Sequence, residues 1–159
     1  KIVARNHQFL GVNRAIRAVG NRDQNQGRLG VFWHTQGSGK SYSMLFFTRK
    51  VHRRIGGNYT FLIVTDRDDL DGQIYGTYVG CGVVGEKDDA RAASGAHLKA
   101  LLQEHKGYVF SLVQKFNEQV RPDNPYSSRE DIIVISDEAP RTQYGMLALN
   151  LRNALPNAA

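Results

Sequence analysis

The most constraining feature of the sequence is a glycine-rich turn between an apolar run and a helical pattern. Leu29 to Trp33 is dense in apolar and aromatic residues. After three intervening residues comes Gly37-Ser38-Gly39-Lys40-Ser41. A helical pattern over residues 40–55 begins at once. Glycines in such a turn let backbone N–H groups face phosphate oxygens, and the start of a helix adds partial positive charge. The pattern therefore predicts a phosphate-binding loop.

The chemistry of this loop gives each residue an expected role. Gly37, Ser38 and Gly39 would wrap the phosphates with their backbone. Lys40 would meet the β- and γ-phosphates, and Ser41 would offer a hydroxyl to Mg²⁺. The generic pattern has glycine at the position of His34, so the match is incomplete there. The alternative is a glycine turn that merely precedes a lysine.

Two acidic residues follow another apolar run. Asp137 and Glu138 come directly after residues 131–136. Uncompensated carboxylates at the end of a buried strand are costly, so Mg²⁺ is their natural partner. Asp137 is expected to bind the metal, and Glu138 to orient and deprotonate an attacking water. The alternative is that Asp137 caps the following helix.

Apolar runs and helical patterns alternate along the chain. The expected strands are residues 29–33, 60–65, 108–113 and 131–136. The expected helices are residues 5–19, 40–55, 67–79, 96–104 and 143–151, with surface loops at 80–95 and 117–129. This alternation predicts an α/β fold with a mainly parallel sheet, helices on both faces, and sites beyond the carboxyl ends of the strands. A length of 159 residues fits a single domain over 1–159.

Composition narrows the function classes. The chain has 21 Lys+Arg against 15 Asp+Glu, a formal charge of +6, which favours a polyanionic partner or simply a basic surface. The single cysteine, Cys81, permits no intrachain disulfide, in keeping with a reducing cytoplasm. No apolar run is long enough to cross a bilayer, so no membrane partner is expected. The start at Lys1 suggests a fragment of a longer chain.

Together these motifs resemble the first RecA-like motor domain of superfamily 2 helicases and translocases. More closely, the chain resembles the R (motor and nuclease) subunit of type I restriction enzymes. The matching stretches are residues 30–41, which include His34 as in that family, 65–73, and 135–139 with 141–143. The resemblance implies a RecA-like P-loop three-layer sandwich with ATP and Mg²⁺ as cofactors. It also implies double-stranded DNA and the methylation and specificity subunits as partners, with the nuclease domain and second motor lobe outside this chain.

The resemblance further implies residue roles that spacing alone does not give. Arg5 and Gln8 match the motif that precedes the phosphate loop, where a glutamine recognises adenine. The alternative for Gln8 is an ordinary exposed helix residue. Arg67 and Gln73 match a segment that lies along the DNA backbone, although Arg67 could instead belong to an ion-pair cluster with the aspartates around it.

Two more segments have open interpretations. Gln114 and Lys115 match another DNA-contacting motif, and the adjacent Phe116 could equally be a core residue. The basic run over residues 49–54 closes a predicted helix, where cations stabilise the helix end without any DNA.

One departure from the family pattern concerns the coupling of ATP hydrolysis to movement along DNA. The acidic motif of that family ends in histidine, whereas this chain has Pro140, which has no side-chain donor or acceptor. The implied function is an ATP-binding lobe that drives DNA translocation before cleavage by the full complex, nearly inactive in isolation. The alternatives are a nucleotide- or DNA-binding module that has lost motor coupling and, more weakly, a P-loop kinase or GTPase. No guanine-reading Asn-Lys-x-Asp stretch supports a GTPase.

Overall fold

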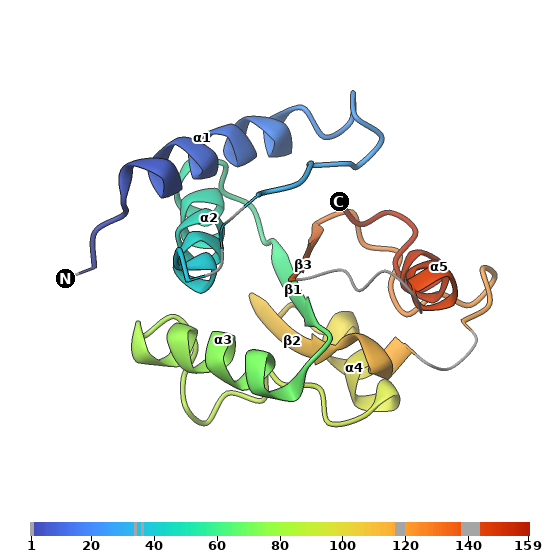
Figure 1. The fold of residues 1–159 in the computed structure, drawn as a ribbon. Coiled ribbons are helices and arrows are strands. Elements are labelled where there is room, and N and C mark those ends of the chain that lie inside the picture. Colours follow the sequence, from blue (N-terminus) through green and yellow to red (C-terminus); the bar gives the residue numbers. More distant parts are fainter. Residues whose placement is uncertain (1, 34, 36, 117–119, 138–143) are drawn as a thin grey trace. The chain divides into compact units, whose positions relative to one another are not determined.

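The chain divides into two compact units. Figure 1 labels the helices and strands of both units. The computed structural model describes residues 2–33, 35, 37–116, 120–137 and 144–159. Unit 1 comprises residues 1–57 with Ala159, and unit 2 comprises residues 58–158.

Unit 1 contains two helices that pack against each other. Helix α1 spans Asn6–Gly20 and α2 spans Lys40–Arg54, close to the predicted bounds. Val12 and Val19 of α1 and Leu45 and Val51 of α2 are buried, so each helix has an apolar face at helical spacing. No helix in the described residues is long and apolar enough to span a membrane.

Unit 2 is built on a parallel sheet. Its strands are β1 (Thr60–Thr65), β2 (Tyr108–Leu112) and β3 (Ile132–Ser136), in the order β2-β1-β3. Ile63 of β1 lies opposite Phe110 on one side and Ile135 on the other. All six residues of β1 are buried, as expected for a central parallel strand.

Helices cover both faces of this sheet. On one face, Tyr78 of α3 (Asp68–Gly80) makes edge-on ring contacts with Tyr108 and Phe110, each at 5.3 Å between centroids. The other face packs on α4 (Gly95–Gln103), α5 (Tyr144–Ala154) and the 3-10 helix η1 (Val113–Phe116). Phe116 is fully buried there, so it is a core residue. The predicted three-layer α/β arrangement with a parallel sheet is confirmed.

One predicted strand is wrong. Residues 29–33 form no strand; Val31 is 92% exposed and Trp33 is 87% exposed. Gly30 adopts φ +114°, which turns the backbone out of the extended region. The run also belongs to unit 1, whose described elements are helices, so that unit offers no strand to pair with it. An apolar run needs a hydrogen-bonding partner to become a strand.

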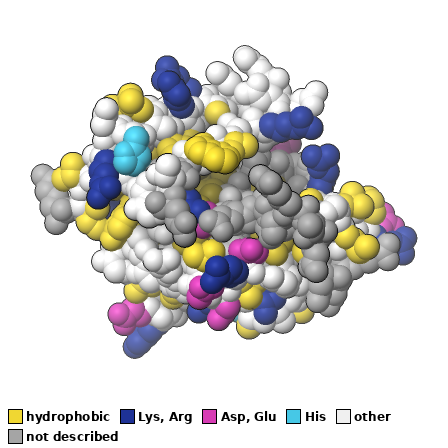
Figure 2. Space-filling view, in the orientation of Figure 1, with side chains coloured by type: hydrophobic (Ala, Val, Ile, Leu, Met, Phe, Trp, Pro, Cys, Tyr) yellow, Lys and Arg dark blue, Asp and Glu magenta, His cyan; other side chains and the backbone are white. Residues whose placement is uncertain are grey.

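Charged side chains mark the start of α3 and the end of α2. The first turn of α3 holds Asp68, Asp69 and Asp71, which complement the positive helix N-terminus. In Figure 2, acidic side chains gather over the start of α3, and Lys and Arg side chains stand over α1. The last turn of α2 is basic, with His52, Arg53 and Arg54.

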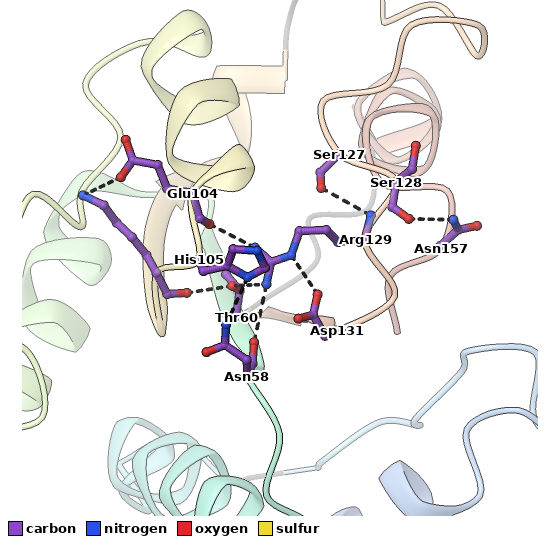
Figure 3. Close-up of polar contacts among 10 residues, drawn as sticks. Asn58, Thr60, Glu104, His105, Ser127, Ser128, Arg129, Asp131 and Asn157 are labelled. Carbon is purple, nitrogen blue, oxygen red and sulfur yellow. Dashed lines mark hydrogen bonds and ion pairs between the residues drawn. The ribbon is translucent and has the colours of Figure 1, made fainter.

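A polar cluster around Arg129 joins the amino-terminal ends of β1 and β3 (Figure 3). The guanidinium donates to Asp131 Oδ1 at 2.8 Å, Thr60 Oγ1 at 2.9 Å and the Glu104 carbonyl at 3.0 Å. Hydrogen bonding from Arg129 lowers the pKa of Asp131. The cluster therefore stabilises the sheet at the amino-terminal ends of its strands, opposite the carboxyl ends where the functional sites are expected.

Candidate functional site

The predicted phosphate loop turns on two glycines with positive φ. Gly37 has φ +74°, and Gly39, the N-cap of α2, has φ +85°. The Ser38 hydroxyl donates to the Thr35 carbonyl at 2.6 Å, and the Ser38 N–H reaches the same oxygen at 3.2 Å. Because side chains disfavour positive φ, glycine at these positions makes the turn possible.

Lys40 and Ser41 open the helix that follows this loop. Both are half-buried and lie in the first turn of α2. The first N–H groups of a helix have no intrahelical partner, so this turn presents donors as well as the lysine. The structure thus places five of the six predicted nucleotide-binding residues in one continuous turn, residues 37–41.

The sixth predicted nucleotide-binding residue, Gln8, lies on α1 and is hydrogen-bonded to the loop. Its Nε2 donates to the Gly39 carbonyl at 3.1 Å, and its Oε1 accepts from the Arg5 N–H at 2.9 Å. His7 Nε2 also lies 3.4 Å from the Ser38 carbonyl oxygen. Gln8 is only 4% exposed, so it is not the exposed helix residue of the alternative interpretation. The amino-terminal turn of α1 and the phosphate loop form one hydrogen-bonded substructure.

Unit 2 brings other predicted residues to the carboxyl edge of its sheet. Gln114, just after β2, donates from Nε2 to the carbonyl of Asp66, just after β1, at 2.8 Å. Asp137, just after β3, is 7% exposed, and its N–H donates to the Val64 carbonyl at 2.9 Å. Parallel strands end at a common edge, which explains this gathering. Glu138 and Pro140 lie outside the described residues.

Arg67 and Gln73 stand on the exposed side of the same region. Arg67 forms a two-point ion pair with Asp69, at 3.1 Å from Nε and 2.7 Å from Nη2. The two side chains are 62% and 64% exposed, so water and salt weaken this pair and a phosphate could compete for the guanidinium. Gln73 is exposed on α3.

Lys115 is held beside this edge by the segment that precedes α4. Its Nζ donates to the Ala93 carbonyl at 2.7 Å. Lys115 as a residue is half-buried, and this hydrogen bond positions its ammonium.

An ion pair between the buried Asp71 and the exposed Arg91 was missed by the sequence analysis. Arg91 contacts the Asp71 carboxylate at 2.8 Å from Nε and 2.6 Å from Nη2. Burial raises the pKa of Asp71, and Arg91 opposes that rise. The neighbouring backbone pairs with β2, because Phe110 N–H donates to the Ala90 carbonyl and Ala92 N–H donates to the Phe110 carbonyl. The two charged residues are twenty positions apart, so no local pattern signals the pair.

The match to a known family settles what kind of domain carries these features. Residues 7–159 match the SWI2/SNF2 ATPase family. The chain belongs to this family. The resemblance to a helicase-like motor domain, based on the phosphate loop and the acidic motif, is confirmed.

Relatives of this SWI2/SNF2 ATPase chain are subunits of restriction enzymes. It is 38% identical to the type I restriction enzyme HindI endonuclease subunit of Haemophilus influenzae, over the whole chain and 17% of that protein. It is 39% identical to the putative MjaIXP endonuclease subunit of Methanocaldococcus jannaschii, over the whole chain and 16% of that protein. The chain thus spans about a sixth of these relatives, and the predicted likeness to type I restriction R subunits is confirmed.

Membership of an ATPase family implies that the chain uses a nucleotide. Within the described residues no group of three or more His, Cys, Asp or Glu side chains is placed to hold a metal. The metal roles of Ser41 and Asp137 stay predictions. Their oxygen donors are of the hard type that Mg²⁺ prefers, and Mg²⁺ commonly uses only one or two protein ligands.

Proposed function

We propose that this SWI2/SNF2 ATPase chain is the ATP-binding lobe of a type I restriction R subunit. In the full complex, ATP hydrolysis at this lobe drives translocation of double-stranded DNA before cleavage, together with methylation and specificity subunits in the cytoplasm. The observation that carries the proposal is the phosphate loop at the start of α2, fastened to Gln8 through Gly39. Its support is the family match and the restriction-enzyme relatives.

Residue roles follow from the chemistry of each side chain. Gly37, Ser38 and Gly39 hold the phosphates through backbone N–H groups, and Lys40 neutralises the β- and γ-phosphates. Ser41 and Asp137 hold Mg²⁺, which supplies positive charge to the phosphate oxygens. Glu138 acts as the base for the attacking water.

DNA contacts are assigned to the carboxyl edge of the sheet and to α3. Arg67 offers a guanidinium that can exchange Asp69 for a phosphate, and Lys115 offers a positioned ammonium. Gln73 and Gln114 offer amide groups for the DNA backbone. These contacts fix the position of the DNA and carry no sequence information.

The decisive experiment is a titration with Mg²⁺ and a fluorescent ATP analogue, alongside a GTP analogue. We expect saturable, adenine-selective binding that weakens at least about tenfold in Lys40→Ala, because the phosphates lose their main cation. Lys87→Ala, on an exposed loop residue, is the matched control and should bind like the parent. Binding that is absent, or equal in Lys40→Ala and the parent, would refute the proposal.

Hydrolysis by the chain alone should be very slow. In comparable phosphoryl-transfer systems an arginine supplied from outside the nucleotide lobe contributes about 10³ to 10⁵ in rate. Brisk DNA-stimulated turnover by the 159-residue chain would contradict this expectation.

The second candidate, a nucleotide- or DNA-binding module without motor coupling, rests on Pro140. In the family that the chain resembles, a histidine at this position is expected to link ATP hydrolysis to movement on DNA, and proline has no side-chain donor or acceptor to replace it. Metal binding and water activation by Asp137 and Glu138 are compatible with either candidate.

A further inference from the structure

Positive charge is concentrated in unit 1. Residues 1–57 contain eleven Lys and Arg and a single acidic residue, Asp23, so their formal charge is +10. The remaining residues hold ten Lys and Arg against fourteen acids, a charge of −4. Asp23 pairs with its neighbour Arg22 at 3.5 Å. Unit 1 therefore has no carboxylate left to balance its other cations, some of which stand over α1 in Figure 2.

Four of these cations line one groove between α1 and α2. The groove has a volume of about 550 Å³. We call it the basic groove; its lining residues are Leu10, Asn13, Arg14, Ile16, Arg17, Lys50 and Arg54. Arg14 and Arg17 are three positions apart on α1, and Lys50 and Arg54 are four apart on α2, so each pair shares one helix face.

The groove is organised by packing. Lys50 Nζ donates to Asn13 Oδ1 across the two helices and lies 5.4 Å from the centre of the Phe9 ring. Arg14, Arg17 and Arg54 are exposed and have no carboxylate partner in the described part of the chain. One cation is thus positioned, and three guanidinium groups are available to a ligand.

Helix-end stabilisation explains only part of this set. Arg17 lies in the last turn of α1 and Arg54 in the last turn of α2, where a cation complements the negative helix end. Arg14 and Lys50 lie before those turns, so the same explanation does not cover them. Like charges three or four positions apart destabilise a helix, and no carboxylate pairs with Arg14, Arg17 or Arg54 among the described residues.

We propose that the basic groove binds the phosphate backbone of duplex DNA. These contacts would be additional to those assigned to Arg67, Gln73, Gln114 and Lys115 in unit 2. The guanidinium fork pairs with phosphate at two points, and a concave groove admits a ridge of phosphates better than a flat lipid surface. The choice of DNA as the partner rests on the proposed function, whereas the groove and its positive charge are features of the structure itself.

The test compares two double variants of the full chain that remove the same charge. Arg14→Gln/Arg54→Gln removes two groove cations, and Arg49→Gln/Arg53→Gln removes two exposed arginines of α2 outside the groove. Binding of a short fluorescent duplex of arbitrary sequence is followed between about 50 and 200 mM salt. We expect the groove variant to bind about tenfold more weakly, with a salt slope smaller by about 2. The control should stay within about threefold of the parent.

Three outcomes would overturn the proposal: no DNA binding by the parent, equal weakening in both double variants, or no weakening in either. Polyglutamate and phosphatidylserine vesicles are titrated in parallel. A groove-dependent loss for one of those probes, without a loss for DNA, would assign the groove to an acidic protein or a membrane instead. The ATP-analogue titration separates the two proposals, since Arg14→Gln/Arg54→Gln should keep nucleotide binding and Lys40→Ala should keep the duplex affinity of the groove.

Discussion

Gln8 holds the phosphate loop by hydrogen bonds, and recognition of adenine is its proposed second role. In the structure both ends of its amide are used, Oε1 by the Arg5 N–H and Nε2 by the Gly39 carbonyl. Each end keeps a second position, the other N–H of Nε2 and the second lone pair of Oε1, so an adenine contact is compatible with both bonds. The residue holds the phosphate loop whether or not it also reads the base.

The two roles of Gln8 predict different selectivity. Gln8→Ala removes the bond to Gly39 and should weaken ATP-analogue binding about tenfold, since one buried hydrogen bond is worth about 1 to 1.5 kcal/mol. If Gln8 also recognises adenine, the GTP analogue loses less affinity than the ATP analogue. Titration of both analogues measures this, and an equal loss for the two would leave Gln8 with the structural role alone.

The two loop glycines predict a graded effect of an added methyl group. Gly39 has φ +85°, and a Cβ there would lie 3.0 Å from Gln8 Nε2. Gly37 has φ +74° with no atom within 4 Å of a built Cβ, so it is the matched control for backbone strain alone. We expect Gly37→Ala to lower the free energy of unfolding by about 1 kcal/mol and Gly39→Ala by about 2 kcal/mol. Urea unfolding measures both, and equal losses would contradict the contact with Gln8.

At the scale of elements, local signals were reliable and long-range pairing was not. The helices at residues 6–20 and 40–54 follow from apolar spacing, and β1 follows from a short run suited to burial on both faces. Residues 29–33 are also mainly apolar but form no strand, because a strand needs a hydrogen-bonding partner that composition does not specify. The loop over residues 37–41 was predictable because its chemistry is contiguous. The Arg91–Asp71 pair was not, because it joins a loop to a helix.

The Arg129 cluster predicts how the sheet responds to acid. Arg129 lowers the pKa of Asp131, so the folded state binds the Asp131 proton less readily than the unfolded state does. The stabilisation is present above the ordinary pKa of about 4 and is lost as the pH falls through the lowered value. In Asp131→Asn the free energy of unfolding should fall less steeply with acid between about pH 5 and 2. Chemical unfolding at several pH values tests this, and a profile as steep as that of the parent would contradict it.

Removing Arg129 itself should lower the free energy of unfolding more than Asp131→Asn does. Arg129→Met leaves Asp131, Thr60 and the Glu104 carbonyl without their shared donor. A loss of about 2 to 3 kcal/mol in the free energy of unfolding is expected at neutral pH. Arg121→Met, which removes an arginine that is 76% exposed and paired with Asp123, is the control and should change little.

At the scale of the whole molecule, nucleotide binding and motor coupling are proposed to depend on different residues. The phosphate loop is complete within unit 1, and its proposed partner Asp137 is in unit 2. The chain spans about a sixth of its restriction-enzyme relatives, so coupling to DNA movement is a property proposed for the full protein. A lobe could therefore bind ATP normally and still fail to drive translocation.

Pro140 allows this separation to be measured. In the full-length protein, Pro140→His should restore a side-chain donor and acceptor at the end of the acidic motif, and one such bond corresponds to about tenfold in rate. We expect faster translocation per ATP hydrolysed, with unchanged affinity for the ATP analogue. Pro140→Ala controls for the loss of the fixed proline φ without adding an imidazole. If the parent and Pro140→His translocate equally well, nothing supports the second candidate, a binding module without motor coupling. If Pro140→Ala gains as much as Pro140→His, the effect comes from releasing the fixed backbone φ of proline and not from the imidazole.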